Sequence, residues 1–201
     1  YAQVQIELNE RKQTEKSLRD SEEKYRTLIE QLPAMVFLDN ATIEGHTLYV
    51  SPQIETILGF TPQEWLESSP GIWSKQVHPD DLEWVHAAYM RCFLNGELFE
   101  EEYRIYTSDG RLKWFHDQAK LLRDETGKPY LILGVTYDIT QRKRAERELN
   151  TAQEELIRKA NYDDLTGLPN RILFLDRLSQ SLLRAKRDRQ LVALLFIDLD
   201  H

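Results

Sequence analysis

The chain has 201 residues and a formal net charge of −8, with 26 Lys and Arg against 34 Asp and Glu. This acidic balance argues against non-specific nucleic-acid binding, which needs a basic face. The single cysteine, Cys92, excludes an internal disulfide and a zinc site built from several cysteines, and it suits a reducing cytoplasm. No apolar run approaches the length that spans a bilayer, so a membrane tether would have to come from a segment before Tyr1.

Residues 1 to 32 predict a long helix, because no Gly or Pro precedes Pro33. The character changes over residues 33 to 140, where short apolar runs alternate with turn residues. Five strands are predicted at 35–38, 47–50, 98–107, 111–123 and 129–138. Four helices are predicted between the second and third strands, at 52–58, 62–67, 72–77 and 78–95. This order predicts one α+β domain.

Residues 140 to 162 return to helix and carry an apolar seam. Its members alternate steps of four and three, as in a heptad: Ala145, Leu149, Ala152 and Leu156. The seam predicts a parallel homodimer through this linker helix. In the first helix, a similar stripe is interrupted at Arg11, so a coiled coil and a helix lying on its own domain both remain open there.

Residues 7–18 and 138–149 share Arg-Lys, Glu and Leu at a constant offset. The second copy is the exit helix of the α+β domain. The first copy is then predicted to be the exit helix of a similar upstream domain, with chance similarity between two charged helices as the alternative.

Four motifs in residues 21 to 140 stand in the order and spacing of a PAS domain with its PAC portion. They are Ser21-Glu22-Glu23-Lys24-Tyr25-Arg26, His78-Pro79-Asp80-Asp81, Asp109-Gly110-Arg111-Leu112-Lys113-Trp114 and Gly134-Val135-Thr136-Tyr137-Asp138-Ile139-Thr140. The resemblance implies a five-stranded antiparallel sheet in the order 2-1-5-4-3 with helices on one face. It also implies sensing or dimerisation rather than catalysis.

A PAS domain holds a cavity between its sheet and its small helices. By similarity to flavin-binding members, the residues that point into this cavity are Tyr103, Ile105, Phe115, Asp117 and Thr136. Flavin photoreceptors also place amide side chains at several of these positions and carry a reactive Cys in a Gly-Arg-Asn-Cys run. Here that run is replaced by Glu67-Ser68-Ser69-Pro70-Gly71, so no flavin is expected.

Haem-binding members of the family use a His on the long helix, where this chain has His86. The predicted buried stripe of that helix is Leu82, Val85 and Tyr89, which puts His86 near the edge and argues against haem. Cys92 is expected to be a small buried or edge thiol, and His78 to mark the helix start. His46 and His116 have no partner at metal-ligand spacing and are expected at the surface. A small or filled cavity with an unknown ligand is therefore predicted.

The junction after the last strand is predicted to couple the sheet to the linker helix, as it does in PAS proteins. Asp138 can pair with Arg142 or Lys143 one turn along, and Thr140 can accept a bond from the helix N-terminus. Ordinary capping without a switch role is the alternative.

Two runs near the end resemble the opening of the GGDEF family, the diguanylate cyclases that condense two GTP into cyclic di-GMP. They are Asp163-Asp164-Leu165-Thr166-Gly167-Leu168-Pro169-Asn170-Arg171 and Phe196-Ile197-Asp198-Leu199-Asp200. An amphipathic helix is predicted at 171–187 and a buried strand at 191–197. The resemblance implies that Asp198 binds Mg²⁺ with the carbonyl of Leu199, and that Asp200 can contribute. The GGDEF loop is not among the 201 residues, so no catalytic residue is assigned and this chain is expected to be inactive.

The predicted organisation is an N-terminal signalling helix (1–20), a PAS/PAC sensor domain (21–140), a coiled-coil linker (141–162) and a truncated α/β GGDEF domain (163–201). The predicted function is the sensory input of a bacterial, cytoplasmic cyclic di-GMP protein that uses GTP when complete. One alternative is a PAS interaction module without a small-molecule ligand. Another is the input of a GGDEF–EAL phosphodiesterase, because the sequence of residues 172–178 also resembles GGDEF domains that precede an EAL domain. The sensor of a histidine kinase is disfavoured, because it would need a His-box helix after the linker, and the GGDEF-like residues 163–171 occupy that place.

Overall fold

A computed structural model describes residues 2–43, 45–195 and 197. The chain forms two compact units, of which the first ends at Lys143 and the second begins at Arg144. Among the described residues, no helix combines the length and the apolar character that crossing a membrane requires.

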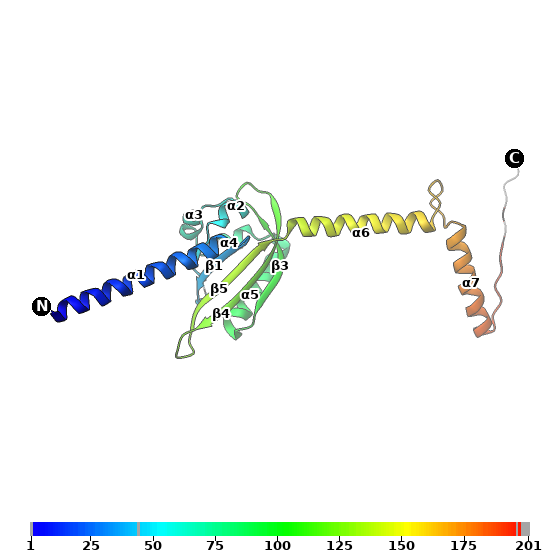
Figure 1. The fold of residues 1–201 in the computed structure, drawn as a ribbon. Coiled ribbons are helices and arrows are strands. Elements are labelled where there is room, and N and C mark those ends of the chain that lie inside the picture. Colours follow the sequence, from blue (N-terminus) through cyan, green and yellow to red (C-terminus); the bar gives the residue numbers. More distant parts are fainter. Residues whose placement is uncertain (1, 44, 196, 198–201) are drawn as a thin grey trace. The chain divides into compact units, whose positions relative to one another are not determined.

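The first unit is built on one antiparallel sheet, with its strands in the order β2-β1-β5-β4-β3 (Figure 1). The strands are β1 Met35–Asn40, β2 Thr47–Val50, β3 Phe99–Tyr106, β4 Leu112–Arg123 and β5 Pro129–Asp138. This is the order that the PAS resemblance implied, and the predicted fold class is confirmed. The central strand β5 pairs with β1 on one side and with β4 on the other, so its side chains lie at the middle of the domain.

Helices cover one face of this sheet (Figure 1). The covering helices lie between β2 and β3 in the chain: α2 Gln53–Ile57, α3 Pro62–Glu67, α4 Ile72–Gln76 and α5 Pro79–Asn95. A further helix, α1 Ala2–Glu30, precedes β1. Local sequence sets their ends. Thr61 and Glu64 form a reciprocal capping box at α3, and Nδ1 of His78 accepts the Asp80 amide at the start of α5. Gly96 ends α5 with a φ of 72°, a left-handed conformation that favours glycine.

The core lies between the sheet and these helices. Alternate side chains of β4 face it, so Phe115, Asp117 and Ala119 are buried while the residues between them lie on the outer face. Gly134 on β5 stands opposite Phe37 on β1. A Cβ atom at Gly134 would collide with the Phe37 ring, so the glycine leaves room for that ring against the sheet.

The second unit contains most of α6 Thr140–Asn161 and all of α7 Arg171–Asp188. The Asn170 side chain caps α7 by accepting the amides of Ile172 and Leu173. The predicted helix at 171–187 is therefore present. The strand predicted at 191–197 is not, because residues 191–195 and 197 belong to no strand and Leu191 is fully exposed. An apolar run becomes a strand only against a pairing neighbour, and the described residues of this unit supply no strand for it.

Candidate functional site

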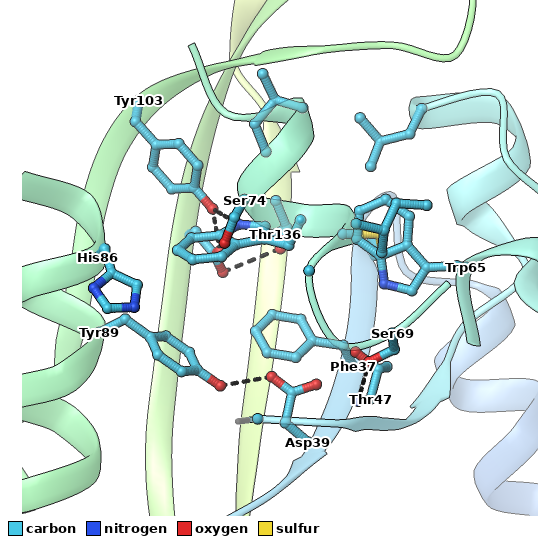
Figure 2. A pocket seen from close by; sticks show the side chains of 18 of the residues that line it. Phe37, Asp39, Thr47, Trp65, Ser69, Ser74, His86, Tyr89, Tyr103 and Thr136 are labelled. Atoms are coloured by element: carbon cyan, nitrogen blue, oxygen red, sulfur yellow. Dashed lines mark hydrogen bonds between the residues drawn. The ribbon is translucent and has the colours of Figure 1, made fainter. Parts of the chain in front are cut away.

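A cavity of about 110 Å³ lies between the inner face of the sheet and the helices. Strand β1 contributes Met35, Phe37 and Asp39 to its wall, and α5 contributes His86 and Tyr89. Figure 2 shows the labelled residues of this wall around a shared space: Phe37, Asp39, Trp65, His86, Tyr89, Tyr103 and Thr136. The cavity is far smaller than the roughly 300–1,000 Å³ of pockets for drug-sized ligands, so it suits a ligand of a few heavy atoms.

Four of the five pocket residues predicted from the sequence line this cavity: Tyr103, Ile105, Asp117 and Thr136. The fifth, Phe115, is fully buried in the core but is not on the cavity wall. Its place on β4, opposite Asp138 and next to the start of α6, accounts for the difference. Phe115 therefore belongs to the core beside the cavity and does not face a ligand.

A chain of hydrogen bonds fixes the Asp117 carboxyl group. The Trp73 indole N–H donates to the Tyr103 hydroxyl at 2.9 Å, and that hydroxyl donates to Oδ2 of Asp117 at 2.7 Å. The Thr136 hydroxyl donates to Oδ1 of Asp117 at 3.0 Å. These groups come from α4, β3, β4 and β5, so the bonds tie the helical layer to the sheet at the cavity.

A second carboxyl group in the wall, Asp39, was not predicted from the sequence. The Tyr89 hydroxyl donates to its Oδ2 at 2.6 Å, as Figure 2 shows, whereas its Oδ1 is buried without a hydrogen-bond partner. The available signal was alternation, since Met35, Phe37 and Asp39 lie two apart on β1 and share one face. Trp73 and Tyr89 were missed as well, because nothing local in their sequence distinguishes them from core aromatic residues.

At the far end of β5, side chains hold the start of α6. Oδ1 of Asp138 accepts the Thr140 amide at 2.9 Å, and Oδ2 pairs with Nζ of Lys113 at 2.8 Å. The Thr140 hydroxyl accepts the Trp114 amide at 3.0 Å. Asp138 thus pairs with the cross-strand Lys113, and not with Arg142 or Lys143 as the sequence predicted.

Arg142 and Lys143 instead bind the outer face of the sheet. Both pair with Glu102 on β3, Arg142 at 2.6 Å and Lys143 at 2.7 Å. These two cations hold the pKa of Glu102 below its usual range, and the hydrogen bond from Lys143 has the largest effect. The ammonium of Lys143 also lies 5.2 Å from the ring centre of Trp114. The first turn of α6 is thereby fixed to β3 and β4 as well as to β5.

Comparison with protein families assigns both parts of the chain. Residues 47–136 match a PAS fold family, and residues 160–201 match the diguanylate cyclase GGDEF domain. The chain is a PAS domain followed by the N-terminal part of a GGDEF domain. The two family resemblances in the sequence are thus confirmed.

Similar proteins include other sensors. An uncharacterised protein of Sinorhizobium fredii is 29% identical over 96% of this chain and 23% of its own length. A methyl sulfide methyltransferase-associated sensor of Methanosarcina acetivorans is 30% identical over 77% of this chain and 16% of its own. The crystal structure of a sensory box histidine kinase/response regulator from Burkholderia thailandensis is 29% identical, with a TM-score of 0.53 over 67% of this chain and 98% of that one. This chain spans less than a quarter of both curated relatives.

The histidines and the cysteine of the PAS domain fall mostly where the sequence indicated. His86 is exposed and borders the cavity, His78 caps α5, and Cys92 is buried beside the Ala119 carbonyl. His46 and His116, expected at the surface, are each half-buried.

The predicted metal ligands Asp198, Leu199 and Asp200 lie outside the described residues. Within the residues that the structure does describe, no three His, Cys, Asp or Glu side chains gather as a metal site would require.

Burial perturbs both carboxyl groups of the PAS cavity. Desolvation raises the pKa of Asp117 to about 7, against the opposing effect of the Tyr103 and Thr136 hydrogen bonds, and the nearby Asp39 carboxylate raises it further. Desolvation also raises the pKa of Asp39, although the Tyr89 hydrogen bond works the other way. Both groups therefore take up protons more readily than an exposed aspartate.

This perturbation predicts a pH-dependent stability of the PAS domain. Because folding raises the pKa of Asp117 from 3.8 to about 7, the folded state binds more protons between those values and its stability falls as the pH rises. Asp117→Asn should remove about 3 kcal/mol of the loss in unfolding free energy between pH 5 and pH 8. Urea unfolding followed by tryptophan fluorescence measures this, since all four tryptophans, from Trp65 to Trp114, lie in the PAS domain. Equal pH dependence of the two proteins would contradict the assignment.

Proposed function

We propose that this chain is the sensory input of a bacterial cyclic di-GMP signalling protein. In the proposal, the PAS domain controls a diguanylate cyclase that condenses two GTP. The GGDEF match at residues 160–201, which begins in the last turn of α6, supports this reading. Because the reaction joins two substrates held by two domains, we propose a homodimer through α6 that presents the cyclase domains to each other.

The observation that carries the proposal is the short, hydrogen-bonded connection between β5 and α6. Only Ile139 separates the end of β5 at Asp138 from the start of α6 at Thr140, and its amide donates to the Trp114 carbonyl at 2.9 Å. Together with the bonds that Asp138 makes to Thr140 and Lys113, this hydrogen bond fixes the end of β5 and the start of α6 to β4. A ligand that shifts the strands at the cavity would therefore change the position of the helix start.

We further propose that the cavity holds neither flavin nor haem. The flavin-type cysteine is missing, His86 is exposed, and about 110 Å³ is too little for either group. A PAS domain that senses a small molecule explains the cavity better than a PAS domain that only dimerises, because the cavity wall carries polar groups at fixed positions.

The coupling role predicts the effect of Asp138→Ala in a chain extended through a complete GGDEF domain. The substitution removes the Lys113 ion pair and the acceptor for the Thr140 amide. Couplings of this kind are worth about 1–3 kcal/mol, so the kcat for GTP conversion should fall by at least about 5-fold while the KM for GTP is unchanged. Chromatography of cyclic di-GMP formed at several GTP concentrations separates these two effects.

Two further variants make this result interpretable. Lys113→Gln, which removes only the ion pair, should show a smaller fall in kcat. Glu154→Gln, on the exposed surface of the same helix, should match the wild type. If Asp138→Ala behaves like Glu154→Gln, the junction is an ordinary helix cap and the coupling role is rejected.

A further inference from the structure

The PAS cavity contains a pair of acidic groups without a Lys or Arg counter-charge among the described residues of its wall. Asp39 and Asp117 both line it, and their exposed fractions are only 7% and 4%. Among the described residues of the cavity wall there is no Lys or Arg, and His86 at the exposed border is the one basic side chain. Hydrogen bonds from Tyr89, Tyr103 and Thr136 reach the two carboxyl groups, and the Thr47 side chain also contacts Asp39. Two carboxylates would thus share one small, largely apolar space without a counter-charge.

The arrangement leaves one acceptor unused. Oδ1 of Asp39 is buried and has no hydrogen-bond partner, although Oδ2 of the same group is bonded to Tyr89. A buried polar atom without a partner costs about 1–3 kcal/mol, and more if it carries charge. Because Asp39 forms part of the cavity wall, a ligand with N–H groups can approach this carboxyl group from the cavity.

Aromatic rings form much of the remaining wall: Phe37, Trp73, Tyr89 and Tyr103. The Trp73 ring lies 5.6 Å from that of Tyr89 and 6.2 Å from that of Tyr103, so the three rings form a cluster beside the carboxyl groups. Aromatic faces attract cations, and they do so most strongly where water is excluded. Figure 2 shows Phe37, Tyr89 and Tyr103 around the same space as Asp39.

We propose that the PAS cavity binds a small organic ammonium ion, with its N–H groups donating to Asp39 and Asp117 and its carbon atoms against the aromatic rings. This inference rests on the proposed sensory function and names its ligand class. A bare metal ion is a poorer fit, because no three acidic, His or Cys side chains among the described residues are close enough together to hold one. The volume of about 110 Å³ limits the ligand to a few heavy atoms.

Ethylammonium is a suitable probe, with ethanol and acetate as its neutral and anionic counterparts of similar size. Titration calorimetry of the 201-residue chain at pH 8, supported by tryptophan fluorescence, should give a dissociation constant for ethylammonium of about 1 mM or tighter. Ethanol and acetate should bind at least 10-fold more weakly. Calcium and magnesium chlorides serve as the metal arm and should not compete with ethylammonium.

Asp39→Asn and Asp117→Asn each remove one negative charge with little change of shape. Each should weaken ethylammonium binding at least 10-fold, without lowering the stability of the unliganded domain at pH 8, since a buried carboxylate is lost. Glu83→Gln removes a carboxylate from the exposed surface of α5 and should bind like the wild type. Circular dichroism establishes that each variant is folded, and the two aspartate variants test the inference independently.

Three results would overturn the inference: no saturable binding of ethylammonium at 10 mM, equal binding of ethanol, or unchanged binding by both aspartate variants. Its failure can be told from failure of the proposed function. No binding together with a clear effect of Asp138→Ala on GTP conversion rejects the ammonium ligand and leaves the coupling intact. Binding without any effect of ethylammonium on GTP conversion by the extended chain keeps the site and rejects its sensory role.

Discussion

Leu149→Glu combined with Leu156→Glu is expected to convert the proposed homodimer into a monomer. The two leucines are 60% and 67% exposed within one chain, although they are large apolar residues on a heptad seam. Ala145 and Ala152 complete this seam and are exposed as well. In a parallel pair of α6 helices the seam would be buried, and glutamates there would be desolvated beside like charges. Because burying unpaired charges costs several kcal/mol, the dissociation constant should rise at least 100-fold.

Sedimentation equilibrium of the wild type and the double variant measures this change. Asn150→Glu combined with Ile157→Glu is the matched control, since it adds the same charges one residue later, on exposed positions beside the seam. The control should remain a dimer. Leu156→Cys in a Cys92→Ser background should form a disulfide only if the two helices are parallel and in register. A monomeric wild type, or a double variant that still dimerises as strongly, would exclude the α6 dimer.

The features that could be predicted from the sequence are those set by local rules. Strand alternation and turn residues predicted all five strands of the PAS domain within a few residues. Capping chemistry placed the ends of α5 at His78 and Gly96. The strand predicted at 191–197 rested on apolar character alone, and such a run does not specify its pairing partner. This strand prediction failed because the apolar run at 191–197 does not itself contain the strand with which it would pair.

The same limit explains the candidate site. Tyr103, Asp117 and Thr136 could be assigned because the resemblance to flavin-binding PAS domains implies which face of their strands points inward. Asp39 could not be matched with Tyr89, because the pair is 50 positions apart and joins β1 to α5. The partner of Asp138 was wrong for a related reason. The i to i+4 rule selects neighbours along a helix, whereas Lys113 reaches Asp138 across the sheet.

Asp198→Ala is expected to abolish most cyclic di-GMP formation in a chain extended through a complete GGDEF domain. Phosphoryl transfer depends on positioning and on charge stabilisation by metal ions, and the family resemblance implies that Asp198 is a ligand of that metal. Its carboxylate is the kind of oxygen donor that Mg²⁺ prefers. Since such a metal stabilises the transition state by several kcal/mol, the rate should fall at least 100-fold. The unextended 201-residue chain should form no product, because it lacks the loop that names the family.

The assay is GTP conversion in the presence of Mg²⁺, followed by chromatography, for the 201-residue chain, the extended chain and its variants. Asp176→Ala, which removes an exposed carboxylate from α7, is the matched control and should keep the activity of the extended wild type. Titration with Mg²⁺ adds a second readout, because loss of a metal ligand should raise the concentration needed for half-maximal rate. Product from the 201-residue chain would refute the assignment of the missing catalytic parts. Full activity of Asp198→Ala would refute its metal role and make Asp200 the next residue to replace.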